Sequence, residues 1–130
     1  MLSDTTKSLA SFEPQQVLVA AWDAFDVVGR VADAIAWEPE ADELHALAAA
    51  QACAAGRALL PLPEFGRPMD TPAVAAGPEG LAPWVDLLHQ VSAALVRLND
   101  EQSADARAVL TEAARHAAVG AEALAAVRRQ

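Results

Sequence analysis

Proline and glycine concentrate in one stretch of this 130-residue chain, and that stretch separates two regions of helix-forming sequence. Six of the eight prolines and three of the six glycines lie between residues 61 and 83. Neither residue continues a helix well, because proline lacks an amide hydrogen and glycine loses more backbone entropy than other residues. The flanking regions are rich in alanine and leucine and show almost no apolar–polar alternation. The chain is therefore expected to fold from helices joined by one long central connection.

Helix signals on either side of this connection predict four helices, which cover residues 14–36, 39–60, 83–98 and 103–128. Three of them begin at a proline, which the first helical turn tolerates because its amide hydrogens have no helical partner. Short links make the first two helices, and the last two, antiparallel neighbours. We predict an all-α four-helix bundle, with the two hairpins joined by a Pro/Gly-rich loop over 61–83. The length allows one domain over 14–130, preceded by a flexible segment over 1–13.

The charge balance argues against partners that are themselves anionic. Nine basic residues against eighteen acidic ones give a net charge of −9. Nucleic acids and anionic membranes are bound by clustered lysine and arginine, so we expect neither as a partner. Cys53 is the only cysteine, which rules out an intramolecular disulfide and a cysteine-based zinc site. The first residues show no basic and apolar signal sequence, so a cytoplasmic location is expected.

Apolar residues recur every three or four positions in the third and fourth predicted helices, as in helices with one buried face. In the third helix this stripe consists of Trp84, Leu87, Leu88, Val91, Ala94, Leu95 and Leu98. In the fourth helix it consists of Val109, Leu110, Ala113, Ala117, Gly120, Leu124 and Val127. Each of these helices is expected to give one face to the core.

The first two predicted helices carry more apolar surface than one core requires. In the second helix, Leu44, Leu47 and Leu59 form a face expected to meet the core, and the opposite face is nearly as apolar. Soluble monomers rarely leave such a patch in water, and a symmetric dimer is a common way to cover it. We therefore predict a homodimer, and a non-catalytic protein–protein interaction module that self-associates. The predicted interface consists of Trp22, Ala46, Ala49, Ala50, Cys53 and Leu60. The alternative is that the loop covers this face with Phe65, Met69, Pro72 and Val74.

Acidic residues gather near the two short links between helices. They are Glu38, Glu40, Asp42, Glu43, Asp100, Glu101 and Asp105. If both links lie at the same end of the bundle, these residues share one acidic pole. Acids in the first turn of a helix also stabilise the helix dipole, by about 0.3–1 kcal/mol each, which accounts for many of them without any partner. The functional alternative is an acidic inhibitor or immunity-type protein that binds a basic partner.

Three carboxylate–histidine pairs have spacings found in metal-binding helical bundles. They are Asp42 with His45, Asp86 with His89, and Glu112 with His116. Two pairs lie away from the apolar stripes and the third lies at the edge of one. The three pairs could converge only by turning apolar faces into water, at roughly 25 cal/mol per Å². We therefore predict no metal site and no cofactor.

Side chains that could act as nucleophiles are present, but none lies in a sequence that activates it. They are Cys53, Ser92, Ser103 and Thr111. None belongs to a G-x-S-x-G turn, and no glycine-rich phosphate loop follows a strand. We predict no catalytic residue, and an enzyme is disfavoured. A third possibility is a ligand-binding or catalytic bundle with its pocket between the first and third helices, under the loop.

Overall fold

The structure is a computed structural model that describes residues 7, 9–10, 14–37, 43–60, 78–99 and 104–128. Four α-helices make up nearly all of this part: α2 (Pro14–Ala36), α3 (Glu43–Leu59), α4 (Pro78–Asn99) and α5 (Ala104–Arg128). The described residues contain no β-strand, so the all-α fold class is confirmed. Most of the loop predicted over 61–83 lies outside the described residues.

Helix α4 begins at Pro78, earlier than the predicted start at Pro83. Pro78 occupies the first helical position, where a missing amide hydrogen is harmless. Pro83 lies in the second turn, where it removes one helical hydrogen bond. The added turn places Leu81 in the core, where it is fully buried, and this burial offsets the lost bond.

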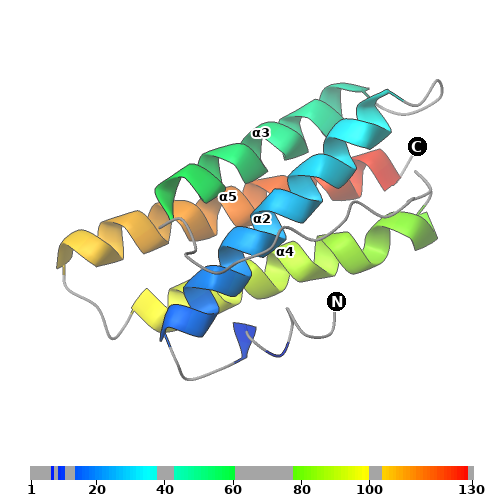
Figure 1. Ribbon diagram of the computed structural model, residues 1–130. Helices are drawn as coiled ribbons and strands as arrows, with labels where there is room; N and C mark the ends of the chain where they lie inside the picture. Colours follow the sequence, from blue (N-terminus) through cyan, green and yellow to red (C-terminus); the bar gives the residue numbers. More distant parts are fainter. Residues whose placement is uncertain are drawn as a thin grey trace.

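The four helices form a bundle around one core (Figure 1). Helix α2 packs against α3 and less extensively against α4, while α5 packs against both α3 and α4. The colours in Figure 1 show that α2 and α5 run toward the end where the C-terminus lies. Helices α3 and α4 both run toward the opposite end. The last described residue after α3 and the first residue of α4 therefore lie at different ends of the bundle.

Helices α4 and α5 bury the stripes that their sequences predict, with one exception. All seven residues of the predicted α4 stripe are buried. In α5 the stripe is buried from Leu110 to Val127, but Val109 is exposed. Val109 lies in the second turn of α5, before the first buried residue of the stripe. The core therefore begins one residue later in α5 than predicted.

Small residues let α2, α3 and α5 approach closely at the centre of the bundle. A Cβ added at Gly29 of α2 would lie 3.3 Å from Cβ of Cys53 in α3. A Cβ added at Gly120 of α5 would lie 3.5 Å from Cβ of Ala52 and 3.7 Å from Sγ of Cys53. At Gly56 an added Cβ would lie 2.5 Å from Cζ of Phe25, so the aromatic ring occupies the space that a side chain would need. The face of α3 that carries Cys53 and Gly56 is therefore a core face.

The chain before α2 contacts the bundle at Leu9. This side chain is buried, and its carbonyl oxygen accepts a hydrogen bond of 2.6 Å from Nη2 of Arg97 in α4. The amide of Ala10 donates to the carbonyl of Lys7, which forms a short turn at the same place. Leu9 belongs to the segment that the sequence predicted to be flexible, and here it adds an apolar side chain to the core.

Candidate functional site

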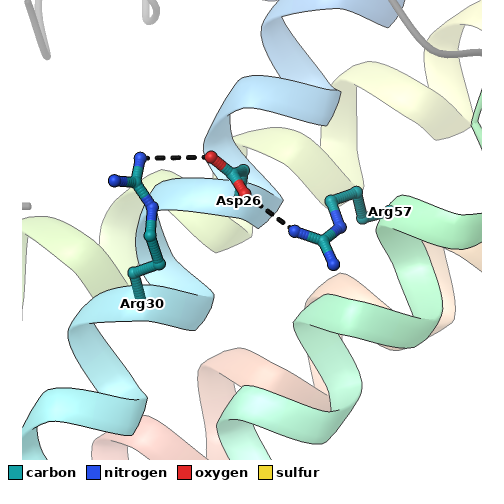
Figure 2. A network of polar contacts seen from close by, with 3 residues as sticks. All are labelled: Asp26, Arg30 and Arg57. Carbon is teal, nitrogen blue, oxygen red and sulfur yellow. Dashed lines mark hydrogen bonds and ion pairs between the residues drawn. The ribbon is translucent and has the colours of Figure 1, made fainter. Parts of the chain in front are cut away.

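A buried carboxylate joins α2 to α3. Asp26 of α2 is only 8% exposed. Its Oδ1 accepts a hydrogen bond of 2.7 Å from Nη1 of Arg57 in α3, and its Oδ2 accepts one of 3.1 Å from Nη2 of Arg30, one turn along α2 (Figure 2). Two guanidinium groups thus supply the hydrogen bonds that a buried carboxylate needs. Both arginines are partly exposed, so solvent screens their charge and the network contributes less than a fully buried pair would. The Arg57 guanidinium carbon also lies 5.7 Å from the centre of the Trp22 ring, within the range of a cation–π contact.

A shallow cavity lies beside the network of Asp26, Arg30 and Arg57. The cavity has a volume of about 250 Å³ and is lined by Phe25, Asp26, Gly29, Arg30, Asp33, Ala50, Ala54 and Arg57. It lies between α2 and α3, whereas the sequence placed a possible pocket between the first and third helices. Its charged lining has two acids and two bases, so the cavity has no net preference for an anion or a cation.

Asp23 lies one turn before Asp26 on α2 and lacks the same support. Its Oδ1 is buried and has no hydrogen-bond partner within the part of the chain that the structure describes. Burial raises the pKa of this carboxyl, and the charge of Asp26 raises it further. The native fold therefore holds a proton on Asp23 more tightly than the unfolded chain does. Ionised Asp23 destabilises the fold at neutral pH, and this penalty is lost as the pH falls through the raised pKa.

We expect Asp23→Asn to raise the melting temperature at pH 7, because the amide has the shape of the carboxylate without its charge. The gain should be smaller at an acidic pH than at pH 7, because the raised pKa of Asp23 lets the wild-type carboxyl take up a proton before an ordinary aspartate does. Thermal melts followed by circular dichroism at both pH values measure this, with Asp33→Asn at an exposed position of the same helix as the control. A lower melting temperature for Asp23→Asn at pH 7 would show that the carboxylate makes a favourable contact instead.

The carboxylate–histidine pairs do not come together. His45 and His89 are exposed, on α3 and α4. Nε2 of His116 in α5 lies 3.6 Å from Oε1 of Glu112, which also pairs with Arg115. Asp42 lies outside the described residues. Among the described residues, no three His, Cys, Asp or Glu side chains are grouped so that they could hold a metal ion.

Two of the side chains considered as nucleophiles, Ser92 and Cys53, take part in the packing between helices. The hydroxyl of Ser92 in α4 donates a hydrogen bond of 3.1 Å to the carbonyl of Ala114, which links α4 to α5. Cys53 is fully buried, and burial raises the pKa of its thiol to about 12 although the nearby charge of Arg57 lowers it slightly. A thiol with this pKa is protonated at neutral pH and is a poor nucleophile. Thr111 is exposed, and Ser103 lies outside the described residues.

The predicted dimer interface is mostly inside a single chain. Ala46, Ala49 and Cys53 have no exposed surface, and Leu60 is also buried. Trp22 and Ala50 are partly buried and pack against the same core. The assignment of the two faces of this helix was therefore wrong, because α2 and α5 cover the small-residue face within one chain. The sequence contained a signal for this packing, since Gly56 continues the small-residue face and allows close helix contact.

The predicted acidic pole is also not one surface. Glu43 begins α3 and Asp105 lies in the first turn of α5, and these helices begin at opposite ends of the bundle (Figure 1). The prediction assumed that both short links lie at one end, but α3 and α4 run in the same direction. The other predicted residues, Glu38, Glu40, Asp42, Asp100 and Glu101, lie outside the described residues.

The most exposed large apolar side chains of the described residues lie at one end of the bundle. Trp37, directly after α2, is 82% exposed, and Leu44, the second residue of α3, is 81% exposed. Helix α2 ends and α3 begins at the same end of the bundle (Figure 1). We call Trp37, Glu43 and Leu44 the α2–α3 tip. Sequence periodicity missed it, because Leu44 is in phase with residues expected to face the core.

Comparison with known proteins gives no match: no family model, curated protein or solved structure aligns significantly with this chain. Within the described ranges, no helix has the length and apolarity needed to cross a lipid bilayer.

Proposed function

We propose that this chain is a non-catalytic helical module that binds other proteins through the α2–α3 tip. The observation that carries this proposal is the exposure of Trp37 and Leu44, each above 80%, at the same end of the bundle. Tryptophan is enriched among residues that dominate binding energy, because it buries a large rigid surface. An isolated exposed side chain would need no explanation, but two large ones next to one helix connection indicate a binding surface.

Self-association through this tip is one form of the proposal. The surface first assigned to a homodimer is largely covered by α2 and α5, so a second copy would have to use other residues. The α2–α3 tip supplies exposed apolar surface that α2 and α5 do not cover. A cytoplasmic site of action belongs to the same proposal.

Site-specific photo-crosslinking tests the proposal in cells that produce the protein. A photoreactive residue in place of Leu44 should give discrete covalent adducts, and adding Trp37→Ala to the same chain should abolish them. The matched control is the same residue in place of Val119, an exposed apolar position on α5. A band at about twice the 13.6 kDa chain mass would identify a second copy as the partner. No adduct at position 44, or the same adducts at position 119, would contradict the proposal.

A further inference from the structure

We propose that Lys7, Leu9 and Ala10 form a releasable strap, which covers one end of the contact between α2 and α4 and opens while the rest of the bundle stays folded. This inference goes beyond the proposed function, because it concerns a different part of the molecule from the α2–α3 tip. The strap is held to the bundle by few contacts, whereas each helix is held by many buried side chains.

The strap lies beside the end of the bundle where α2 begins and α4 ends (Figure 1). Arg97, which bonds to the Leu9 carbonyl, is two residues before the last residue of α4. Pro14 begins α2 four residues after Ala10. Helix α2 packs less extensively against α4 than against α3. The strap therefore lies beside the less extensive of these two helix contacts.

Leu9 attaches the strap to the bundle in two ways. Its side chain is only 2% exposed and belongs to the core, and its carbonyl oxygen accepts the hydrogen bond from Nη2 of Arg97. Lys7 and Ala10 are exposed, and the hydrogen bond between their backbones stays within the strap. In the described part of the strap, one buried side chain and one hydrogen bond from a charged donor thus hold it against the bundle.

Opening the strap costs much less free energy than removing a helix from the bundle. Loss of one buried leucine and one charged hydrogen bond makes the open form no rarer than roughly one chain in ten thousand, because the chain entropy regained lowers the cost. A helix would instead expose several apolar side chains, and α4 alone fully buries Leu81, Leu88 and Leu95. Weakly held segments of this kind open by themselves while the remaining structure stays intact.

Release of the strap uncovers apolar surface at this end of the bundle. Val17 in the first turn of α2 and Leu98 in the last turn of α4 are both buried. With Leu9 withdrawn, solvent or an apolar molecule reaches the core at the ends of these helices. The strap is therefore a conformational device that sets whether this apolar surface is available.

Hydrogen exchange of single backbone amides, followed by NMR on the full chain in zero to about 1 M urea, tests the release of the strap. The Ala10 amide donates to the Lys7 carbonyl, so it exchanges when the strap opens. Its protection should lie between roughly thirtyfold and ten thousandfold, and urea should hardly change it, because opening the strap exposes little surface. The Leu88 amide, in the middle of α4, should be protected more strongly and should exchange faster with each addition of urea.

Two results of this measurement would overturn the inference. Equal protection and equal urea dependence of the Ala10 and Leu88 amides would show that the strap opens only when the whole bundle unfolds. Exchange of the Ala10 amide at the rate of an unstructured chain would show that the strap is not closed in the native protein.

Variants identify the contacts that close the strap. Leu9→Ala should speed exchange of the Ala10 amide by about thirtyfold or more, and Arg97→Gln by about tenfold or more. The matched controls are Lys7→Ala within the strap and Val96→Ala next to Arg97, both at exposed positions. Each control should change the Ala10 rate by less than about threefold. Equal rates in Leu9→Ala and Lys7→Ala would show that Leu9 does not hold the strap.

The Leu9→Ala variant also shows whether the bundle survives release of the strap. Its circular dichroism should keep the wild-type helix signal and its Leu88 amide should stay protected, while an apolar dye such as anilinonaphthalene sulfonate should gain severalfold more fluorescence than with wild type or Lys7→Ala. Loss of protection at Leu88 would contradict the inference, because Leu9 would then be a part of the core that the fold cannot lose. Unchanged dye fluorescence would contradict it as well, since release would then uncover no apolar surface.

Discussion

Ala49→Glu is expected to unfold the protein rather than to release a folded monomer. Ala49 has no exposed surface, on a face of α3 that packs against α2 and α5. A glutamate here would bury a charge with no partner prepared for it, at a cost of several kcal/mol. Small domains have a total stability of about 5–15 kcal/mol, so most of it would be lost. Circular dichroism should show little helix, or a melting temperature lower by tens of degrees.

Ala48→Glu is the matched control, because it adds the same side chain one position earlier on the exposed side of α3. It should melt within a few degrees of the wild type, since surface substitutions usually change stability by less than about 0.5 kcal/mol. A folded Ala49→Glu variant with a wild-type melting temperature would contradict the account. In that case Ala49 would lie on a surface, where a second copy could cover it.

The sequence predicts a helix well where one apolar stripe is bounded by polar residues. The stripe of α4 is buried throughout, from Trp84 to Leu98, because large apolar side chains on one face leave the helix one favourable orientation. The starts and ends of α2 and α5 also lie within about one residue of the predicted positions, because residues that favour a helix start precede or begin each helix. Pro14 marks the start of α2, and polar residues around Asp100 precede α5.

The orientation of α3 could not be predicted from apolarity alone. Both of its faces are apolar, and the larger side chain of Leu44 suggested that the leucine face was the core face. Close packing reverses this choice, because Gly29 and Gly120 bring two other helices so near to Cys53 that only small side chains fit. The contact that decides the orientation joins residues far apart in the chain, and periodicity within one helix does not contain it.

The polar network around Asp26 also depends on a contact between residues far apart in the chain. The pairing of Asp26 with Arg57 joins residues 31 positions apart, which charge patterning along one helix does not reveal. The acidic pole failed because its two described members, Glu43 and Asp105, belong to helices that start at opposite ends.

The reactivity of Cys53 should be suppressed in the native protein by about a thousandfold or more. The thiolate is the reactive form, and a pKa of about 12 leaves very little of it at pH 8 compared with an ordinary cysteine. The thiol is also fully buried, so a reagent reaches it only when the fold opens. A Cys53→Ala, Ala48→Cys variant, with its thiol on the exposed side of α3, should react at the rate of a free cysteine.

The rate at which a thiol reagent labels Cys53 at different protein concentrations tests most directly whether the small-residue face of α3 lies in the core of a single chain. The measurement is the labelling rate of native Cys53 with a thiol reagent in excess, from high micromolar to nanomolar protein. If α2 and α5 of the same chain cover Cys53, the rate is slow and the same at every protein concentration, and it becomes fast only in denaturant. A rate that rises as the protein is diluted would show that a second copy protects the thiol, and would contradict this assignment of the core.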